Sequence, residues 1–74
     1  MHVTVILVGA FRVGRFEEEV RDYPPTTCVR EVIAELQLPM PLLGTVLING
    51  THAGIDGLLH DGDTLCLLPF MDGG

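Results

Sequence analysis

The chain has 74 residues, 47% of them apolar, and a formal net charge of −6 from ten acidic residues against four arginines and no lysine. A chain this short forms one domain with a small core, which leaves little room for a catalytic cleft, and its acidity disfavours nucleic acid as a partner. No signal peptide or apolar run of the ~20 residues that a membrane helix needs is present, so we expect a cytoplasmic, non-enzymatic protein that does not bind membranes.

The first third of the chain predicts two strands. Residues 2–8 are too short for a helix and rich in β-branched residues, which favours a strand ended by Gly9. Residues 11–15 read as a connection. Residues 17–23 can pair back as a second, more polar strand, whose three consecutive glutamates are typical of a solvated sheet edge.

A single amphipathic helix is predicted next. Pro24-Pro25 ends the second strand, and Thr26 or Thr27 is a good N-cap. From Cys28 to Gln37 apolar residues recur with the spacing of one helix face: Val29, Val32, Ile33 and Leu36. Two further prolines, at 39 and 41, prevent its continuation.

A third strand, 46–48, precedes the tight-turn signal Asn49-Gly50. Residues 51–60 form a loose stretch, for which Leu58 or Leu59 is the expected anchor into the core. The turn Asp61-Gly62-Asp63 then leads into a final strand.

The order strand, strand, helix, strand, strand favours an α+β domain with a mixed sheet of four to five strands packed on one main helix. We expect the first strand and the final strand, 64–68, to lie parallel and adjacent in the middle of the sheet. Alternation then turns one set of residues toward the helix: Val3, Val5, Leu7, Leu65 and Leu67. The other set forms an open face, a candidate docking surface: Ile6, Val8, Cys66 and Leu68.

The chain ends in Pro69-Phe70-Met71-Asp72-Gly73-Gly74. We therefore divide it into a domain, 1–69, and a flexible tail, 70–74. Glycine has no Cβ, so such a tail could enter a narrow channel. The reactive group would be the α-carboxylate of Gly74, presented with Gly73, and Phe70 and Met71 would anchor the arm on a partner by apolar contact.

This pattern resembles the MoaD/ThiS family of sulfur-carrier proteins, which have the ubiquitin-like β-grasp fold. The resemblance covers essentially the whole chain and is carried by four segments: Val46-Leu47-Ile48-Asn49-Gly50, Leu59-His60-Asp61-Gly62-Asp63, Leu67-Leu68-Pro69 and Gly73-Gly74. The tail departs from the family pattern, because Phe70 and Asp72 stand where members often have a second proline and a small residue.

The resemblance implies a carrier that binds no stable cofactor. A MoeB/ThiF-like adenylyltransferase, using ATP and Mg²⁺, would activate the Gly74 carboxylate as an acyl-adenylate, and a sulfurtransferase or cysteine desulfurase would supply the sulfur of a thiocarboxylate. The protein is most similar to the small subunit of molybdopterin synthase. Its sulfur acceptor would then be a MoaE-like large subunit in the biosynthesis of the molybdenum or tungsten cofactor.

Other functions remain open at this point. The acceptor could be thiazole synthase, as for a ThiS-like carrier of thiamine synthesis, or a cysteine-forming enzyme or a tRNA thiolation system. The chain could also be a ubiquitin-like modifier joined through Gly74 to lysines of its targets, or a non-covalent β-grasp interaction module.

The cysteines and histidines carry no clear chemistry of their own. Cys28 and Cys66 have no metal-like spacing, and we expect packed thiols that do not bear the transferred sulfur. Three histidines also lack ligand-like spacing, so no metal site is predicted: His2, His52 and His60.

Overall fold

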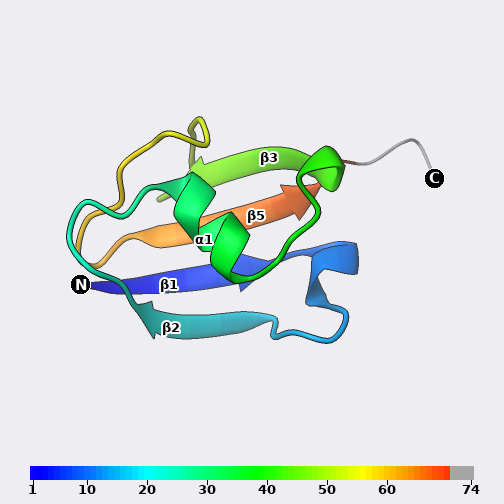
Figure 1. The fold of residues 1–74 in the computed structure, drawn as a ribbon, viewed down its shortest axis with the longest axis horizontal. Helices are drawn as coiled ribbons and strands as arrows, with labels where there is room; N and C mark the ends of the chain where they lie inside the picture. Colours follow the sequence, from blue (N-terminus) through cyan, green and yellow to red (C-terminus); the bar gives the residue numbers. More distant parts are fainter. Residues whose placement is uncertain (71–74) are drawn as a thin grey trace.

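The computed structural model describes residues 1–70, which form a five-stranded mixed sheet and one α-helix lying across one of its faces (Figure 1). The strands are β1 (His2–Leu7), β2 (Glu18–Asp22), β3 (Leu43–Ile48), β4 (Thr51–His52) and β5 (Thr64–Pro69). The helix is α1 (Val29–Glu35), and two 3-10 turns are η1 (Gly9–Arg12) and η2 (Met40–Leu42). The expected α+β architecture is confirmed.

The sheet has the order β2-β1-β5-β3-β4. β1 and β5 pair in parallel near its middle, with Val5 opposite Leu65 and Leu7 opposite Leu67, as expected from the sequence. β2 is antiparallel to β1, and β3 is antiparallel to β5. The first and last strands of the described chain therefore hold the two halves of the sheet together.

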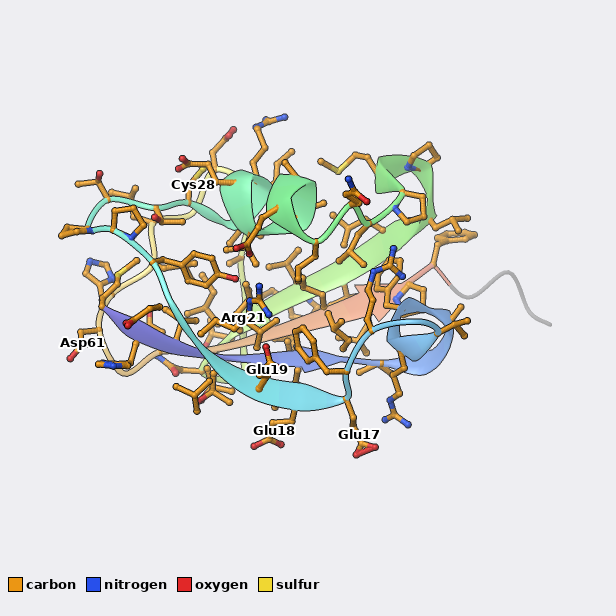
Figure 2. All side chains as sticks on the ribbon, turned by 60° about the horizontal axis from the view of Figure 1, so that its bottom comes forward. Glu17, Glu18, Glu19, Arg21, Cys28 and Asp61 are labelled. Carbon is orange, nitrogen blue, oxygen red and sulfur yellow. The ribbon has the colours of Figure 1, made fainter. Side chains whose placement is uncertain are left out.

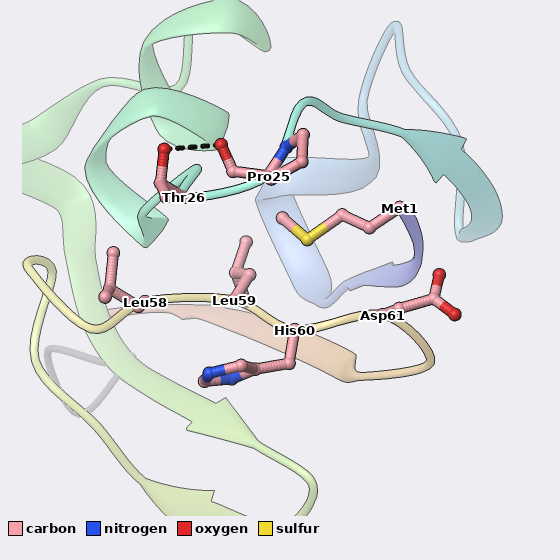
Figure 3. A pocket seen from close by; sticks show the side chains of 7 residues that line it. All are labelled: Met1, Pro25, Thr26, Leu58, Leu59, His60 and Asp61. Carbon is pink, nitrogen blue, oxygen red and sulfur yellow. Dashed lines mark hydrogen bonds between the residues drawn. The ribbon is translucent and has the colours of Figure 1, made fainter.

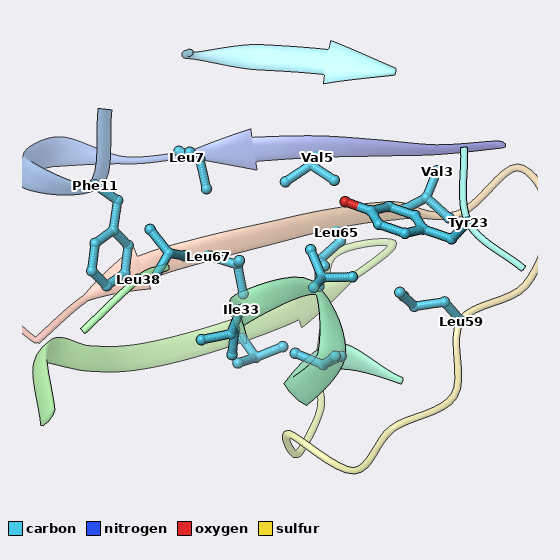
Figure 4. Packing of buried hydrophobic residues seen from close by; sticks show 13 residues of the cluster. Val3, Val5, Leu7, Phe11, Tyr23, Ile33, Leu38, Leu59, Leu65 and Leu67 are labelled. Atoms are coloured by element: carbon cyan, nitrogen blue, oxygen red, sulfur yellow. The ribbon is translucent and has the colours of Figure 1, made fainter. Parts of the chain in front are cut away.

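The core lies between α1 and the central strands (Figure 4). Alternate residues of β1 and β5 are fully buried there, which confirms the predicted division of each strand between two faces: Val3, Val5, Leu7, Leu65 and Leu67. α1 contributes Val29, Val32 and Ile33. Of the two expected anchors in the 51–60 stretch, Leu59 is 2% exposed whereas Leu58 is 54% exposed, so Leu59 is the anchor.

The predicted N-cap of the helix is wrong. Cys28 caps α1, and Glu31 in the first turn accepts the Cys28 N–H through Oε1 at 3.0 Å. Thr27 is buried before the helix, where its hydroxyl donates to the Pro24 carbonyl at 2.7 Å and its carbonyl accepts the Leu59 N–H at 2.9 Å. The hydrogen bonds of Thr27 thus stabilise the loop that precedes the helix. Thr26 has a left-handed φ of 69°, which is typical of a turn.

The helix is also shorter than the apolar spacing predicts. It ends at Glu35, and Gln37 has a left-handed φ of 55°. Arg15 fastens this end: its Nε donates to the Leu36 carbonyl and its Nη2 to the Gln37 carbonyl, both at 3.0 Å. A side chain from the 9–17 connection thereby satisfies carbonyls that a helix end leaves unpaired.

Two strands differ from the prediction. β3 begins at Leu43, not residue 46, and β4 occupies the start of the stretch expected to be loose. Asn49 and Gly50 both have positive φ, 52° and 80°, which turns the chain tightly enough for β4 to pair back on β3.

A polar contact joins β2 to α1. Tyr23 is 7% exposed, and its hydroxyl donates to Glu35 Oε1 at 2.8 Å while it accepts from Arg21 Nε at 3.1 Å. Arg21 also pairs with Glu35 directly, at 3.4 Å. Burial, followed by the hydrogen bond to Glu35, raises the pKa of Tyr23 to about 12.

We expect this contact to make stability fall at high pH. Tyr23 loses its proton near pH 10 in the unfolded chain but near pH 12 in the folded one. Its contribution to the free energy of unfolding is therefore complete below pH 10 and is lost as pH rises toward 12. The free energy of unfolding should fall by at most about 1.4 kcal/mol per pH unit through this titration. With no lysine in the sequence, no amine side chain titrates in this window.

Urea unfolding measured across this pH range should show a steeper loss for the wild type than for Tyr23→Phe, which has no hydroxyl to titrate. Identical slopes for the two proteins would mean that the contact does not form in solution.

Candidate functional site

The end of β5 is where the predicted site begins. Pro69 closes the strand at the end of the long axis opposite the N-terminus (Figure 1). The next residue, Phe70, is 64% exposed, while its backbone N–H donates to the Leu42 carbonyl of η2. Of the predicted tail residues, Met71, Gly73 and Gly74 lie outside the described residues, as does Asp72.

The predicted docking residues of the sheet do share one surface. Ile6 and Leu68 are partly exposed in β1 and β5, Val8 lies just beyond β1, and Cys66 stands opposite Ile6. All lie on the side of the sheet away from α1, since their strand neighbours are the buried core residues. The open face is therefore present, and it is continuous up to the residue that precedes Pro69.

Two apolar residues of this face were not predicted. Val20 of β2 is 63% exposed and stands opposite Thr4, and Leu47 of β3 stands opposite Cys66. Both extend the open face across neighbouring strands. Val20 could have been found from the sequence by applying the same alternation to 17–23, where it is the single aliphatic residue.

Acidic side chains border the open face. Glu18, opposite Ile6, projects from β2 into solvent beside Glu17 (Figure 2), and in residues 1–70 it forms no ion pair. Glu19 and Arg21, by contrast, turn to the helix side and bond to each other. Glu17 pairs with Arg12 at 3.7 Å, so Glu18 supplies the unpaired negative charge beside the apolar surface, which suits a partner with a basic group next to an apolar patch.

The described side chains do not assemble a catalytic constellation. Cys28 and Cys66 are free, partly buried thiols, and burial raises the pKa of Cys66, which disfavours the reactive thiolate. His2 and His60 each approach a carboxylate, Asp22 at 3.4 Å and Asp63 at 3.8 Å. Within residues 1–70, no group of three or more His, Cys, Asp or Glu side chains could hold a metal ion.

A pocket of about 390 Å³ lies at the other end of the domain, where β1 begins (Figure 3). It is lined by Met1, Pro25, Thr26, Leu58, Leu59, His60 and Asp61, and its walls are mainly apolar. It lies at the opposite end of the domain from Pro69, where β5 ends. None of the helices formed by residues 1–70 is long and apolar enough to span a membrane.

No protein-family model and no curated protein sequence matches the chain. Several solved structures do. SAMP1 from Haloferax volcanii is 20% identical over 100% of both chains, with a TM-score of 0.75. The putative molybdopterin converting factor, subunit 1, from Pyrococcus furiosus is 25% identical over 93% of this chain and 97% of that one, also with a TM-score of 0.75.

A chain in the complex of subunits 1 and 2 of the molybdopterin-converting factor from Helicobacter pylori is 23% identical over 100% of both chains, with a TM-score of 0.67. These likenesses confirm the ubiquitin-like fold and, at the level of the fold, the resemblance to proteins of the MoaD/ThiS type.

The two faces of β5 should respond differently to a charge. Leu67→Asp places a carboxylate in the core, where burial without a partner is costly, so we expect a loss of about 4 kcal/mol or more in the free energy of unfolding. Leu68→Asp, one residue along on the open face, should cost about 1 kcal/mol. Urea unfolding of the two variants measures the difference, and similar losses would show that the face assignment fails in solution.

Proposed function

We propose that this protein is a sulfur carrier of the MoaD/ThiS type whose Gly74 carboxylate is activated and converted to a thiocarboxylate. The observation that carries the proposal is the geometry of β5: a strand fixed in the middle of the sheet ends at Pro69, and Gly73-Gly74 follows within five residues. The fold of the putative molybdopterin converting factor subunit 1, at 25% identity, supports the same role.

The chemistry needs partners because a carboxylate is a poor electrophile. An adenylyltransferase of the MoeB/ThiF type would use ATP and Mg²⁺ to join AMP to the Gly74 carboxylate, releasing pyrophosphate. A persulfide on a sulfurtransferase or cysteine desulfurase would then attack the carbonyl carbon and displace AMP, giving an acyl disulfide. A second thiol would attack the sulfur on the enzyme side, leaving the thiocarboxylate on Gly74 and a disulfide on the enzyme.

The acceptor that we propose is a large subunit resembling MoaE, in the synthesis of the molybdenum or tungsten cofactor. A structural neighbour was solved as a complex of subunits 1 and 2 of a molybdopterin-converting factor, which supports a two-subunit assembly. On this chain the open face and its acidic border would bind the body of the partner, while Phe70 and Met71 would lead the tail to its active site. The protein itself would remain a substrate or subunit, acting in the cytoplasm.

A protein modifier is the second candidate. It is favoured by the likeness to the small archaeal modifier protein 1 of Haloferax volcanii, 21% identical with a TM-score of 0.73. In that case the activated Gly74 would acylate lysines of target proteins. The chain has no lysine, so it could not form lysine-linked polymers, and each target lysine would carry a single copy.

The position of the Gly74 carboxylate should decide activation. Deleting Gly73-Gly74 withdraws the carboxylate, and adding one alanine after Gly74 extends it and introduces a Cβ. Because a misplacement of about 1 Å can cost roughly 100-fold in rate, both changes should nearly abolish adenylation and sulfur transfer. Intact mass, measured after incubation with the adenylyltransferase, ATP, and a persulfide donor with a thiol, should show one oxygen replaced by sulfur in the wild type alone.

Both variants retain every core residue and should melt at the wild-type temperature, which serves as the control for folding. The proposal fails if the wild type never gains the sulfur mass with a competent activating enzyme, or if the extended chain gains it equally well. Lysine-linked adducts in place of the sulfur mass would favour the modifier.

The open face should contribute to binding of the adenylyltransferase. Leu68→Asp replaces an apolar contact by a charge while the fold persists, so we expect the dissociation constant to rise by about 10-fold to 100-fold, equivalent to one apolar anchor of about 1.5–3 kcal/mol. Titration calorimetry would measure it, with Leu58→Asp as a control at the opposite end of the domain. Equal effects of the two substitutions would remove the open face from the interface.

A further inference from the structure

The chain leaves the sheet between two glycines. Gly44 lies in β3 and Gly9 begins η1, and both approach the Pro69 region at the end of β5. A Cβ on Gly9 would stand 3.4 Å from Pro69 Cγ, an ordinary contact, although the φ of +59° itself favours glycine. A Cβ on Gly44 would instead collide with backbone atoms of Pro69 and Phe70.

At Gly44 the added atom would lie 2.8 Å from the Cα of Phe70, 2.9 Å from its nitrogen and 2.9 Å from the carbonyl oxygen of Pro69. These are backbone atoms, and they cannot rotate away as the tip of a side chain can. Gly44 also sits at an irregularity in the pairing of β3 with β5, where the register shifts between Leu43 and Thr45. Glycine at such a position is typical of a bulge over which another backbone passes closely.

The close approach permits a specific bond. The Phe70 N–H donates to the Leu42 carbonyl. That carbonyl belongs to η2, a turn that has proline at its start and is closed by the Leu42 N–H bonding to Pro39 O at 2.9 Å. The acceptor is therefore held by a stiff turn, and it fixes the backbone one residue beyond the last strand. On the other side, the Val8 N–H donates to Leu67 O at 3.2 Å.

We propose that Gly44 and the Leu42 carbonyl form a tail clamp, a positioning device that fixes the point and direction from which residues 71–74 leave the domain. The inference rests on the proposed function and deepens it. With Phe70 held, four residues separate the clamp from the Gly74 carboxylate, so its reach is at most about 14 Å. Without the clamp the arm would start earlier, point in more directions and place the carboxylate at the nucleotide less often.

The clamp is distinct from the core. The three closest atoms to a Cβ on Gly44 all belong to Pro69 and Phe70, whose side chains lie outside the buried cluster. Gly44→Ala should thus displace the root of the tail more than it disturbs the packing under α1. Gly54→Ala is a matched control, because a Cβ at Gly54 meets no atom within 4 Å and Gly54 does not have a positive φ.

The test combines a structural and a kinetic measurement on the full chain. Amide hydrogen exchange followed by NMR reports whether the Phe70 N–H is bonded, and steady-state adenylation separates kcat from KM for the carrier. In Gly44→Ala we expect exchange at Phe70 to accelerate at least 10-fold and kcat to fall at least 10-fold, with KM within about twofold because the open face is intact. Gly54→Ala should leave all three unchanged.

A second pair of variants removes the bond without touching β3. Phe70→Pro lacks the N–H donor, whereas Phe70→Ala keeps it and loses only the ring. Both lose the phenyl ring, so the difference between them reports the loss of the N–H donor together with the fixed φ that proline imposes. We expect Phe70→Pro to have a kcat at least 5-fold below that of Phe70→Ala.

The outcomes separate the clamp from the carrier function. If Phe70 exchanges rapidly in the wild type, or is equally protected in Gly44→Ala, the clamp does not exist as described. If exchange accelerates but kcat is unchanged, and Phe70→Pro equals Phe70→Ala, the clamp has no positioning role although the carrier function stands. If the wild type is never adenylated, the proposed function fails and the positioning role fails with it, whatever the exchange data show.

Discussion

The parallel pairing of β1 with β5 is the constraint on which the rest of the structure depends. It joins residues about sixty positions apart, Val5 opposite Leu65, and it buries the alternate side chains of both strands under α1. The same alternation sends Ile6 and Leu68 to the opposite face. One pairing thus sets the core, the open face and the direction in which the chain leaves the sheet.

The packed body formed by residues 1–70 is distinct from the chemistry that we propose for Gly74. The buried residues are almost all apolar, and the polar contacts that cross the domain, such as Arg15 to the end of α1 and Tyr23 to Glu35, hold elements together. What the body offers a partner is an apolar sheet face bordered by negative charge, and a strand that ends at its rim. In the function that we propose, the nucleotide and the nucleophile come from partner proteins.

Much of this was predictable because the signals were periodic and local. Alternation in 2–8 and 64–68 assigned the faces correctly, and the spacing of Val29, Val32 and Ile33 gave the helix. The errors arose where tertiary contacts override local preference. Thr27 is a better N-cap than Cys28 by residue type, but its hydroxyl and carbonyl are used to close the preceding loop. Gly44 lies outside the strand predicted from the sequence, 46–48, and its close approach to Phe70 becomes visible only when β5 is laid beside β3. The start of β3 and the clamp therefore required the structure. The docking and sulfur-transfer roles of the site residues stay predictions.

The pairing of β1 with β5 also determines when the domain can fold during synthesis. Contacts between the two ends of a chain form late and slowly, because a long loop must close before they are gained. During synthesis β1 emerges first and has no central partner until β5 is complete, so the sheet cannot assemble around a shortened chain. A body able to dock therefore exists only once the strand that carries the tail has been made. In this architecture, a completed fold shows that synthesis has passed β5, whereas the presence of Gly73-Gly74 leaves no mark on the fold.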